Sequence, residues 1–207
     1  VYNNTSLASL SLTGATSLTS VKLSAGTENT ALTSLAITNC GIDSLDVTYL
    51  KNLEVLDVTN CASLTTLTAM GCTKLNELTL VGCSGLTDID ISGCTSLLNI
   101  DVNDCTQLKN LNATGSGITG FSATSLTSLE SLDLTDCNSI STLTLTSCSN
   151  LTNVIGLSDC SALSSLVVIN SGIQDVDLQE NVNLETVRFR QCNSLTSLNL
   201  RRTDDNK

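Results

Sequence analysis

The chain has 207 residues, enough for one domain, and carries a formal net charge of −11. Hydrophobic residues make up 41% of it but aromatic residues only 2%, so a core must be built from aliphatic side chains and cysteine. The acidic balance argues against nucleic acid and anionic membrane surfaces as partners, and the absence of histidine removes the commonest general base and metal ligand. No apolar run reaches the roughly 18 residues of a membrane-spanning helix, so we expect no membrane insertion.

A pattern of apolar residues, L-x-x-L-x-L-x-x-C, repeats along the chain, and most copies are eleven residues long. The first apolar position of the eighteen units falls at Leu7, Leu18, Leu32, Ile42, Leu53, Leu64, Leu75, Leu86, Leu97, Leu108, Ile118, Leu129, Ile140, Leu151, Leu163, Ile173, Leu184 and Leu195. Self-similarity at a fixed period indicates a repeat architecture. We therefore interpret residues 1–207 as a single repeat domain, with repeats over about residues 7–203.

Each unit is predicted to form a short strand followed by a bend. The inner part of a unit, such as Asp88–Ser92, alternates polar and apolar residues, which is typical of a strand with one buried face. One unit cannot fold alone, because ordering eleven residues costs about 1.5 kcal/mol each, whereas burying three aliphatic side chains returns roughly 2 kcal/mol each. The units must therefore stack and share one core, as in a solenoid.

The segment Leu53–Cys61, which reads LEVLDVTNC, resembles the strand segment of leucine-rich repeats. The eleven-residue spacing is similar to a bacterial subclass in which both half-repeats carry the strand pattern. The resemblance implies coils of about 22 residues with a parallel strand on each side. The expected fold is a mainly β, right-handed leucine-rich-repeat solenoid of about nine coils, with little helix and weak curvature.

Alternate units then lie on opposite sides of the solenoid, and residues about 22 apart stack in columns. Face A is formed by the units that begin at Leu32, Leu53, Leu75, Leu97, Ile118, Ile140, Leu163 and Leu184. Face B is formed by the units that begin at Ile42, Leu64, Leu86, Leu108, Leu129, Leu151, Ile173 and Leu195.

Irregularities interrupt the repeat at several points in chain order. The unit from Leu18 is longer, through Gly26–Ala31, and three ten-residue units end in Gly41, Gly117 and Gly172. One further residue is inserted near Ile155–Gly156. A spacer is expected to be uniform and a binding module to break its repeat where it binds, so these breaks favour binding.

Acidic and amide side chains on face B are candidates for a cation site. Asp88 and Asp90 should lie beside Asn110 and Asn112 of the next coil, and oxygen ligands suit calcium. Acidic residues in the outward column, however, are never adjacent. That spacing avoids repulsion between like charges in neighbouring strands, so a solvated polar face is the favoured interpretation and no metal or other cofactor is predicted.

The ten cysteines all fall at the same bend position of their units. Side chains in register point the same way, which suits stacking better than the near-90° torsion of a disulfide. Free cysteine behaves as a small buried hydrophobe, so we predict free thiols.

Val167 and Ile169 are expected to point outward on face A, next to Arg188 and Arg190. Exposed apolar residues beside arginines are a reasonable place for a protein partner to dock. The alternative is that the arginines serve solubility and cover the end of the solenoid.

The sequence contains no catalytic constellation, so we expect a non-enzymatic protein. The resemblance implies a binding or adhesion module that recognises a protein or glycan at a bacterial surface. A surface rich in Ser, Thr, Asn and Asp, with few lysines, favours a secreted or cell-surface location. The alternative is a structural spacer or stalk in a larger surface protein or virion assembly. Neither end shows an obvious polar cap, so we expect the chain to be part of a larger protein, with a neighbouring domain or subunit covering an end.

Overall fold

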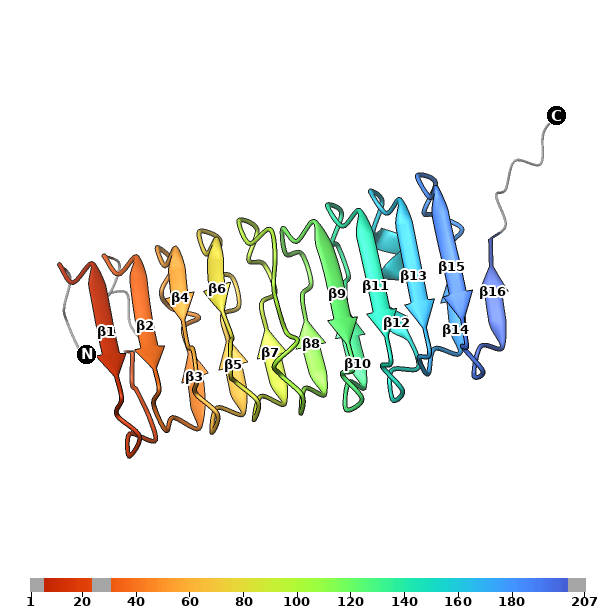
Figure 1. Ribbon diagram of the computed structural model, residues 1–207. Helices are drawn as coiled ribbons and strands as arrows, with labels where there is room; N and C mark the ends of the chain where they lie inside the picture. The colour runs from red at the N-terminus through yellow and green to blue at the C-terminus, as the bar shows by residue number, and fades with distance from the viewer. Residues whose placement is uncertain (1–5, 24–30, 201–207) are drawn as a thin grey trace.

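The computed structural model describes residues 6–23 and 31–200. Figure 1 shows a nearly straight row of coils with the first and last strands at opposite ends. The predicted mainly β solenoid is confirmed: all strand pairs among the described residues are parallel, and they wind about eight turns. The helix content of this part of the chain is the three-residue 3-10 helix η1 (Leu157–Asp159). The predicted break at Gly26–Ala31, apart from Ala31, and the end of the last unit lie outside the described residues.

The strands divide between the two faces as the repeat predicts. Face A carries β1 (Ser9–Thr13), β2 (Ser34–Thr38), β4 (Val55–Asp57), β6 (Glu77–Thr79), β9 (Gly120–Thr124), β11 (Thr142–Thr146), β13 (Ser165–Ile169) and β15 (Thr186–Arg190). Face B carries β3 (Ser44–Asp46), β5 (Thr66–Thr68), β7 (Asp88–Asp90), β8 (Asn110–Asn112), β10 (Ser131–Asp133), β12 (Val154–Ile155), β14 (Asp175–Asp177) and β16 (Ser197–Asn199).

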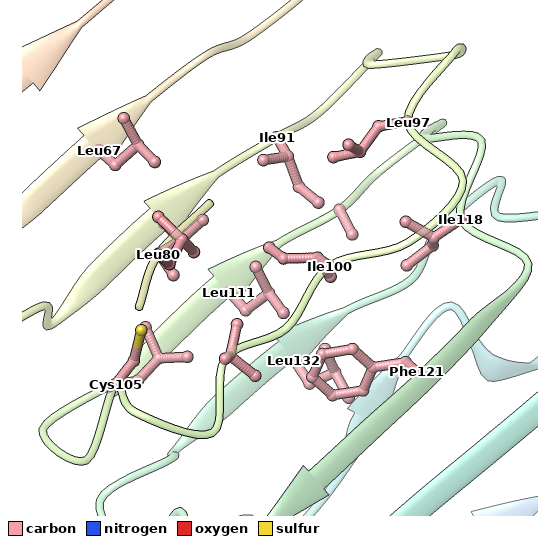
Figure 2. Close-up of a cluster of buried hydrophobic side chains, with 14 of the residues drawn as sticks. Leu67, Leu80, Ile91, Leu97, Ile100, Cys105, Leu111, Ile118, Phe121 and Leu132 are labelled. Carbon is pink, nitrogen blue, oxygen red and sulfur yellow. The ribbon is translucent and has the colours of Figure 1, made fainter. Parts of the chain in front are cut away.

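The core is a continuous column of aliphatic side chains between the faces. In β11, Leu143 and Leu145 are completely buried, while the three threonines that alternate with them point outward. Figure 2 shows side chains from both faces meeting in this core, among them Ile100 from face A and Leu111 from face B. Each fully buried leucine contributes roughly 2 kcal/mol of transfer free energy, so stacking supplies what a single coil lacks.

Most bends turn at a residue directly before the cysteine position. This residue has a left-handed backbone, as at Asn60 (φ 58°), Gly93 (φ 67°) and Asp136 (φ 58°). Glycine, asparagine and aspartate tolerate this conformation better than other residues. Their recurrence before the cysteine therefore explains how the chain leaves one face and enters the next.

The three ten-residue units each require their glycine. A side chain on Gly41, Gly117 or Gly172 would overlap the backbone carbonyl group of Thr16, Thr95 or Ser149, respectively, in the preceding coil. The backbones of two coils come into direct contact at these positions, and only glycine leaves room for that contact.

The sheet of face A is split in two. One part has the order β1-β2-β4-β6 and the other β15-β13-β11-β9, whereas face B is continuous over the same coils, in the order β12-β10-β8-β7-β5-β3. The segment Asn99–Asn103 lies between β6 and β9 and forms no strand. It is joined to its neighbours by Thr119, whose N–H donates to Leu98 O (2.9 Å), rather than by a ladder. Its outward residues, two asparagines and an aspartate, are types depleted from strands.

The predicted insertion at Ile155–Gly156 also interrupts a sheet. Gly156 has a left-handed backbone (φ 71°) and leads into η1, so β12 is only two residues long. Beyond it, β14 and β16 form a separate two-stranded sheet. Each face is therefore interrupted once, at different coils.

Candidate functional site

The four residues proposed as a docking spot lie side by side on face A. Val167 and Ile169 in β13 pair in register with Arg188 and Arg190 in β15, as predicted. The two aliphatic side chains are half-buried, whereas both arginines are exposed. This β13–β15 patch, as we call these four residues, combines an apolar surface with two guanidinium groups.

The four polar residues considered as a cation site are also neighbours, because Asp88 pairs with Asn110 and Asp90 with Asn112. Both carboxylate oxygens of Asp88, however, are engaged within the protein. Thr87 Oγ1 donates to Asp88 Oδ2 and Asn110 Nδ2 donates to Asp88 Oδ1, both at 2.6 Å, and these two hydrogen bonds lower the pKa of Asp88. Among the described residues, no group of three or more His, Cys, Asp or Glu side chains could hold a metal ion.

The recurrent aspartate at the strand ends has a structural role that sequence reasoning missed. In the central outward column, its Oδ1 accepts a hydrogen bond of 2.9–3.1 Å from the backbone N–H two residues later, at Asp46, Asp57, Asp90, Asp101, Asp133 and Asp177. Asn112 accepts the same bond through its amide oxygen (3.1 Å). These Asx turns close the strands locally. The sequence signal for these turns is an Asp or Asn placed two residues before Thr, Ser, Asn or Gln.

The cysteines form a ladder of free thiols along the core. Each Sγ except that of Cys105 donates to a backbone carbonyl of the preceding coil, as Cys61 does to Ile37 O and Cys83 to Val58 O, both at 3.0 Å. The thiol thus satisfies a carbonyl that points into the bend. Asn181, at the same position of its unit, donates to Leu157 O and Cys160 O instead.

Burial keeps most of these thiols protonated. It raises the pKa of Cys72 and Cys83 to about 11, and that of Cys94, Cys105 and Cys160 to about 12. Because the thiolate is the reactive form of cysteine, these residues are poor nucleophiles and poor metal ligands.

Two shallow hollows flank the unpaired segment of face A. The β6 hollow, of about 200 Å³, is lined by Leu78, Thr79, Leu80, Val81, Asp101 and Asp104. The β9 hollow, of about 380 Å³, is lined by Asn99, Ile100, Thr119, Gly120, Phe121, Ser122, Ser141, Thr142 and Thr144. Sequence reasoning missed both, because the unit from Leu97 carries the same pattern as its neighbours.

No helix within residues 6–23 and 31–200 combines the length and apolar character needed to cross a bilayer.

Comparison with known proteins places the repeat in context. A family model described as the LRR domain of the endo-β-N-acetylglucosaminidase EndoS matches residues 29–136, just over half of the chain. A comparison with curated protein sequences gives no match.

Solved structures of bacterial leucine-rich-repeat proteins are similar at low identity. The functional domain of InlJ from Listeria monocytogenes, described as including a cysteine ladder, is 19% identical over 87% of this chain, with a TM-score of 0.35. The chain spans 50% of the length of that InlJ domain. An internalin, InlF, from the same species is 16% identical over 93% of this chain and 66% of its own, with a TM-score of 0.31. A leucine-rich-repeat protein of Leptospira interrogans is 17% identical over 82% of this chain and 54% of its own, with a TM-score of 0.35.

Proposed function

Since the chain belongs to the family of leucine-rich-repeat domains described by that of EndoS, we propose that it is a non-catalytic binding module. The leucine-rich-repeat fold supports a protein-binding role. We propose further that the module acts at a bacterial surface or outside the cell, and that its ligand is a protein or a glycan.

The chemistry of the side chains supports a non-catalytic role. The central aspartates of both faces are engaged in Asx turns, as at Asp57 and Asp133, where backbone N–H groups occupy one carboxylate oxygen at 2.9 Å. Burial raises the pKa values of eight thiols, those of Cys61, Cys72, Cys83, Cys94, Cys105, Cys137, Cys148 and Cys160. The groups that acid–base or nucleophilic catalysis would use therefore serve the fold.

The observation that carries the binding proposal is the β13–β15 patch. Arginine is a typical anchor of protein interfaces, and apolar surface beside it marks sites of protein interaction. Here two arginines project beside two aliphatic side chains from one flat pair of strands. Because the strands are held by a complete ladder, binding orders little extra backbone and costs little entropy.

Alanine substitutions test this proposal against a matched control. Val167→Ala with Ile169→Ala, and Arg188→Ala with Arg190→Ala, should each weaken binding to partners captured with the whole chain by about tenfold or more. Captured partners would be identified by mass spectrometry, purified and remeasured by calorimetry. Thr144→Ala with Thr146→Ala alters the adjacent strand β11 and should leave affinity unchanged; loss of affinity in the control alone would place the interface elsewhere.

Burial of the cysteines supports the proposed extracellular location. An oxidising exterior converts accessible thiols to disulfides, but nine of the ten cysteines are buried and only Cys192 is half-buried. The thiols are therefore compatible with that environment. Fractionation of cells that produce the protein, followed by detection with an antibody, checks the location.

A spacer is the second candidate function, favoured by the nearly straight row of coils whose two ends lie far apart (Figure 1). If the chain is a spacer, none of the surface variants above should lower the affinity for a captured partner.

Exposed apolar side chains in the last described turn support the proposal that a neighbouring domain or subunit packs against that end of the solenoid. Val187, Leu198 and Leu200, which occupy core positions of the repeat, are 37%, 40% and 53% exposed. A domain or subunit that continues the core would bury them. Light scattering of the chain over a range of concentrations tests for a second subunit.

A further inference from the structure

At the β6 hollow the split of face A opens onto side chains of the core. Its floor is apolar: Leu78 is half-buried and Leu80 is 2% exposed. Val81 stands at its rim and is 54% exposed. In the preceding coil, by contrast, the residues at the positions of Leu78 and Leu80, Leu56 and Val58, are fully buried.

Two carboxylates close the other side of the hollow, and each is fixed by one backbone N–H. Asn103 N–H donates to Asp101 Oδ1 at 3.0 Å, and Gly82 N–H donates to Asp104 Oδ2 at 3.1 Å. The position of each carboxylate is thus set from within the protein. The second oxygen of each is used by no hydrogen bond among the described residues, so it is available to a ligand.

The surroundings of the hollow are acidic. The outward strand positions of face A from Val55 to Thr146 include Asp57, Glu77 and Asp101, but neither lysine nor arginine. Two lysines of the preceding coils belong to the bends, where Lys51 donates to Met70 O and Lys74 to Asn52 Oδ1. A cationic group near the hollow would therefore meet a negative potential.

Backbone groups at the hollow are also unpaired. In the coil before, Val58 N–H donates to Thr79 O at 3.1 Å. At the split, no backbone hydrogen bond joins the equivalent Leu80 N–H to Asp101 O. The polar backbone at the rim therefore remains open to water or to a partner.

We propose that the β6 hollow receives a lysine or arginine side chain from a basic segment of a protein partner. The alkyl stem would lie on Leu78, Leu80 and Val81, and the charged head would reach Asp101 and Asp104. Long cationic side chains combine such a stem and head, and paired carboxylates favour them through charge-assisted hydrogen bonds. The inference deepens the proposed binding role, on which it rests, by naming the chemistry of the partner segment.

Nuclear magnetic resonance titration tests the hollow without a natural partner. The probe is a Gly-Arg-Gly tripeptide with both ends blocked, and its citrulline counterpart, equal in shape but uncharged, is the ligand control. The arginine peptide should shift the amide signals of Leu80, Val81, Gly82 and Asp104 in the ¹⁵N-labelled chain. The citrulline peptide should bind at least tenfold more weakly, because it lacks the charge.

Charge-removing variants make the test specific. Asp101→Asn with Asp104→Asn should weaken binding of the arginine peptide by about tenfold or more. The fold should persist, because Asn112 already forms the same Asx turn as Asp101. Asp46→Asn with Asp133→Asn removes the same charge from face B and should leave binding unchanged. An equal loss in the control would reveal attraction to the net charge alone and overturn the proposal.

Two other outcomes would also overturn it. If calcium chloride shifts these amide signals and the arginine peptide does not, the hollow is a cation site. If the arginine peptide causes no shift at these amides, the hollow does not bind this ligand. Partner binding through the β13–β15 patch is measured independently, so the proposed function could survive either result.

Discussion

The coil that begins at Leu97 forms a paired strand on face B but not on face A. On face A, Asn99–Asn103 pairs with neither neighbour, whereas on face B the same coil continues into β8, which pairs with both β7 and β10. The core positions are nevertheless closed on both sides: Ile100 is 8% exposed and Val102 0%, against 1% for Leu111. Figure 2 shows Ile100 on a segment without strand geometry, pointing into the core like its neighbours.

This contrast separates side-chain packing from backbone hydrogen bonding, two contributions to stability that usually act together in a solenoid. Side-chain packing, the bends and the ladder of β8 on face B keep the unpaired segment in the stack. The ladder adds backbone hydrogen bonds worth about 1 kcal/mol each. A single coil can therefore lose its ladder on one face without losing its place, because stability is a sum over neighbouring units.

Hydrogen exchange should show the largest difference between the two faces. The amides of Ile100 and Val102 have no backbone acceptor, whereas Ala113 N–H donates to Asp133 O at 2.9 Å. We expect the first two to exchange about a hundredfold faster or more than Leu111 and Ala113, since local opening is not needed. Residue-resolved exchange by nuclear magnetic resonance measures this; equal protection would mean that face A is paired in solution.

Alkaline pH tests whether the split admits water to the thiols. Unfolded cysteines lose their protons from pH 9.0 upward, whereas the folded chain retains them up to about 11 at Cys83 and about 12 at Cys105. Above pH 9.0 the unfolded state therefore binds fewer protons, and stability falls as pH rises. Well below that pH these groups have no effect. Melting temperatures by circular dichroism should accordingly be flat near pH 7, begin to decline from about pH 8 and fall steeply above about pH 9.

Single substitutions show how much of the loss of stability at high pH comes from the cysteine of each coil. Cys83→Ala and Cys105→Ala should each make the decline shallower, because burial raises both pKa values. An unchanged slope for Cys105→Ala would show that water reaches this thiol through the split. Alkylation of the folded chain at pH 8 should modify Cys192, the half-buried thiol, first.

Truncation of matched core residues compares packing on the two faces. Leu111→Ala should lower the free energy of unfolding by about 3 kcal/mol, and Ile100→Ala by about 2 kcal/mol, because the unpaired segment can relax into the cavity. Urea denaturation measures both. A larger loss for Ile100→Ala would mean that packing on face A compensates for its missing ladder.

Glycine substitutions probe the bend that leads from β8 to β9. Gly117→Ala should cost about 2 kcal/mol, because the new methyl group overlaps Thr95 O of the preceding coil. Gly115→Ala is the matched control: it has open space and a left-handed backbone (φ 61°), so it should cost only about 1 kcal/mol. Equal losses would indicate that the coils separate to admit the methyl group.

The period of the sequence predicted the solenoid, the two faces and the register of their columns. Val167 beside Arg188 and Asp88 beside Asn110 followed from counting about 22 residues. These features are predictable because a solenoid coil contacts only its neighbours, so one spacing determines every pairing.

The split of face A was not predictable in this way. Asn110–Asn112 forms a strand although its composition is close to that of Asn99–Asp101, which does not. Whether such polar segments pair depends on how both neighbouring backbones approach them, and an eleven-residue pattern does not contain that information. The Asx turns are present as a local pattern, but from the sequence we interpret the repeated aspartates as spaced charges and candidate cation ligands.

The Asx turn allows the surface charge of this solenoid to vary independently of its backbone. Aspartate and asparagine close a strand equally, as Asp90 and Asn112 do in adjacent coils. Exchanging one for the other changes the charge of a single coil by one unit and leaves the turn intact. Over many coils, divergence at these positions can produce rods of the same shape with different electrostatic patterns. A repeat of this kind can acquire new partners without refolding, and an engineer can redesign its surface charge one coil at a time.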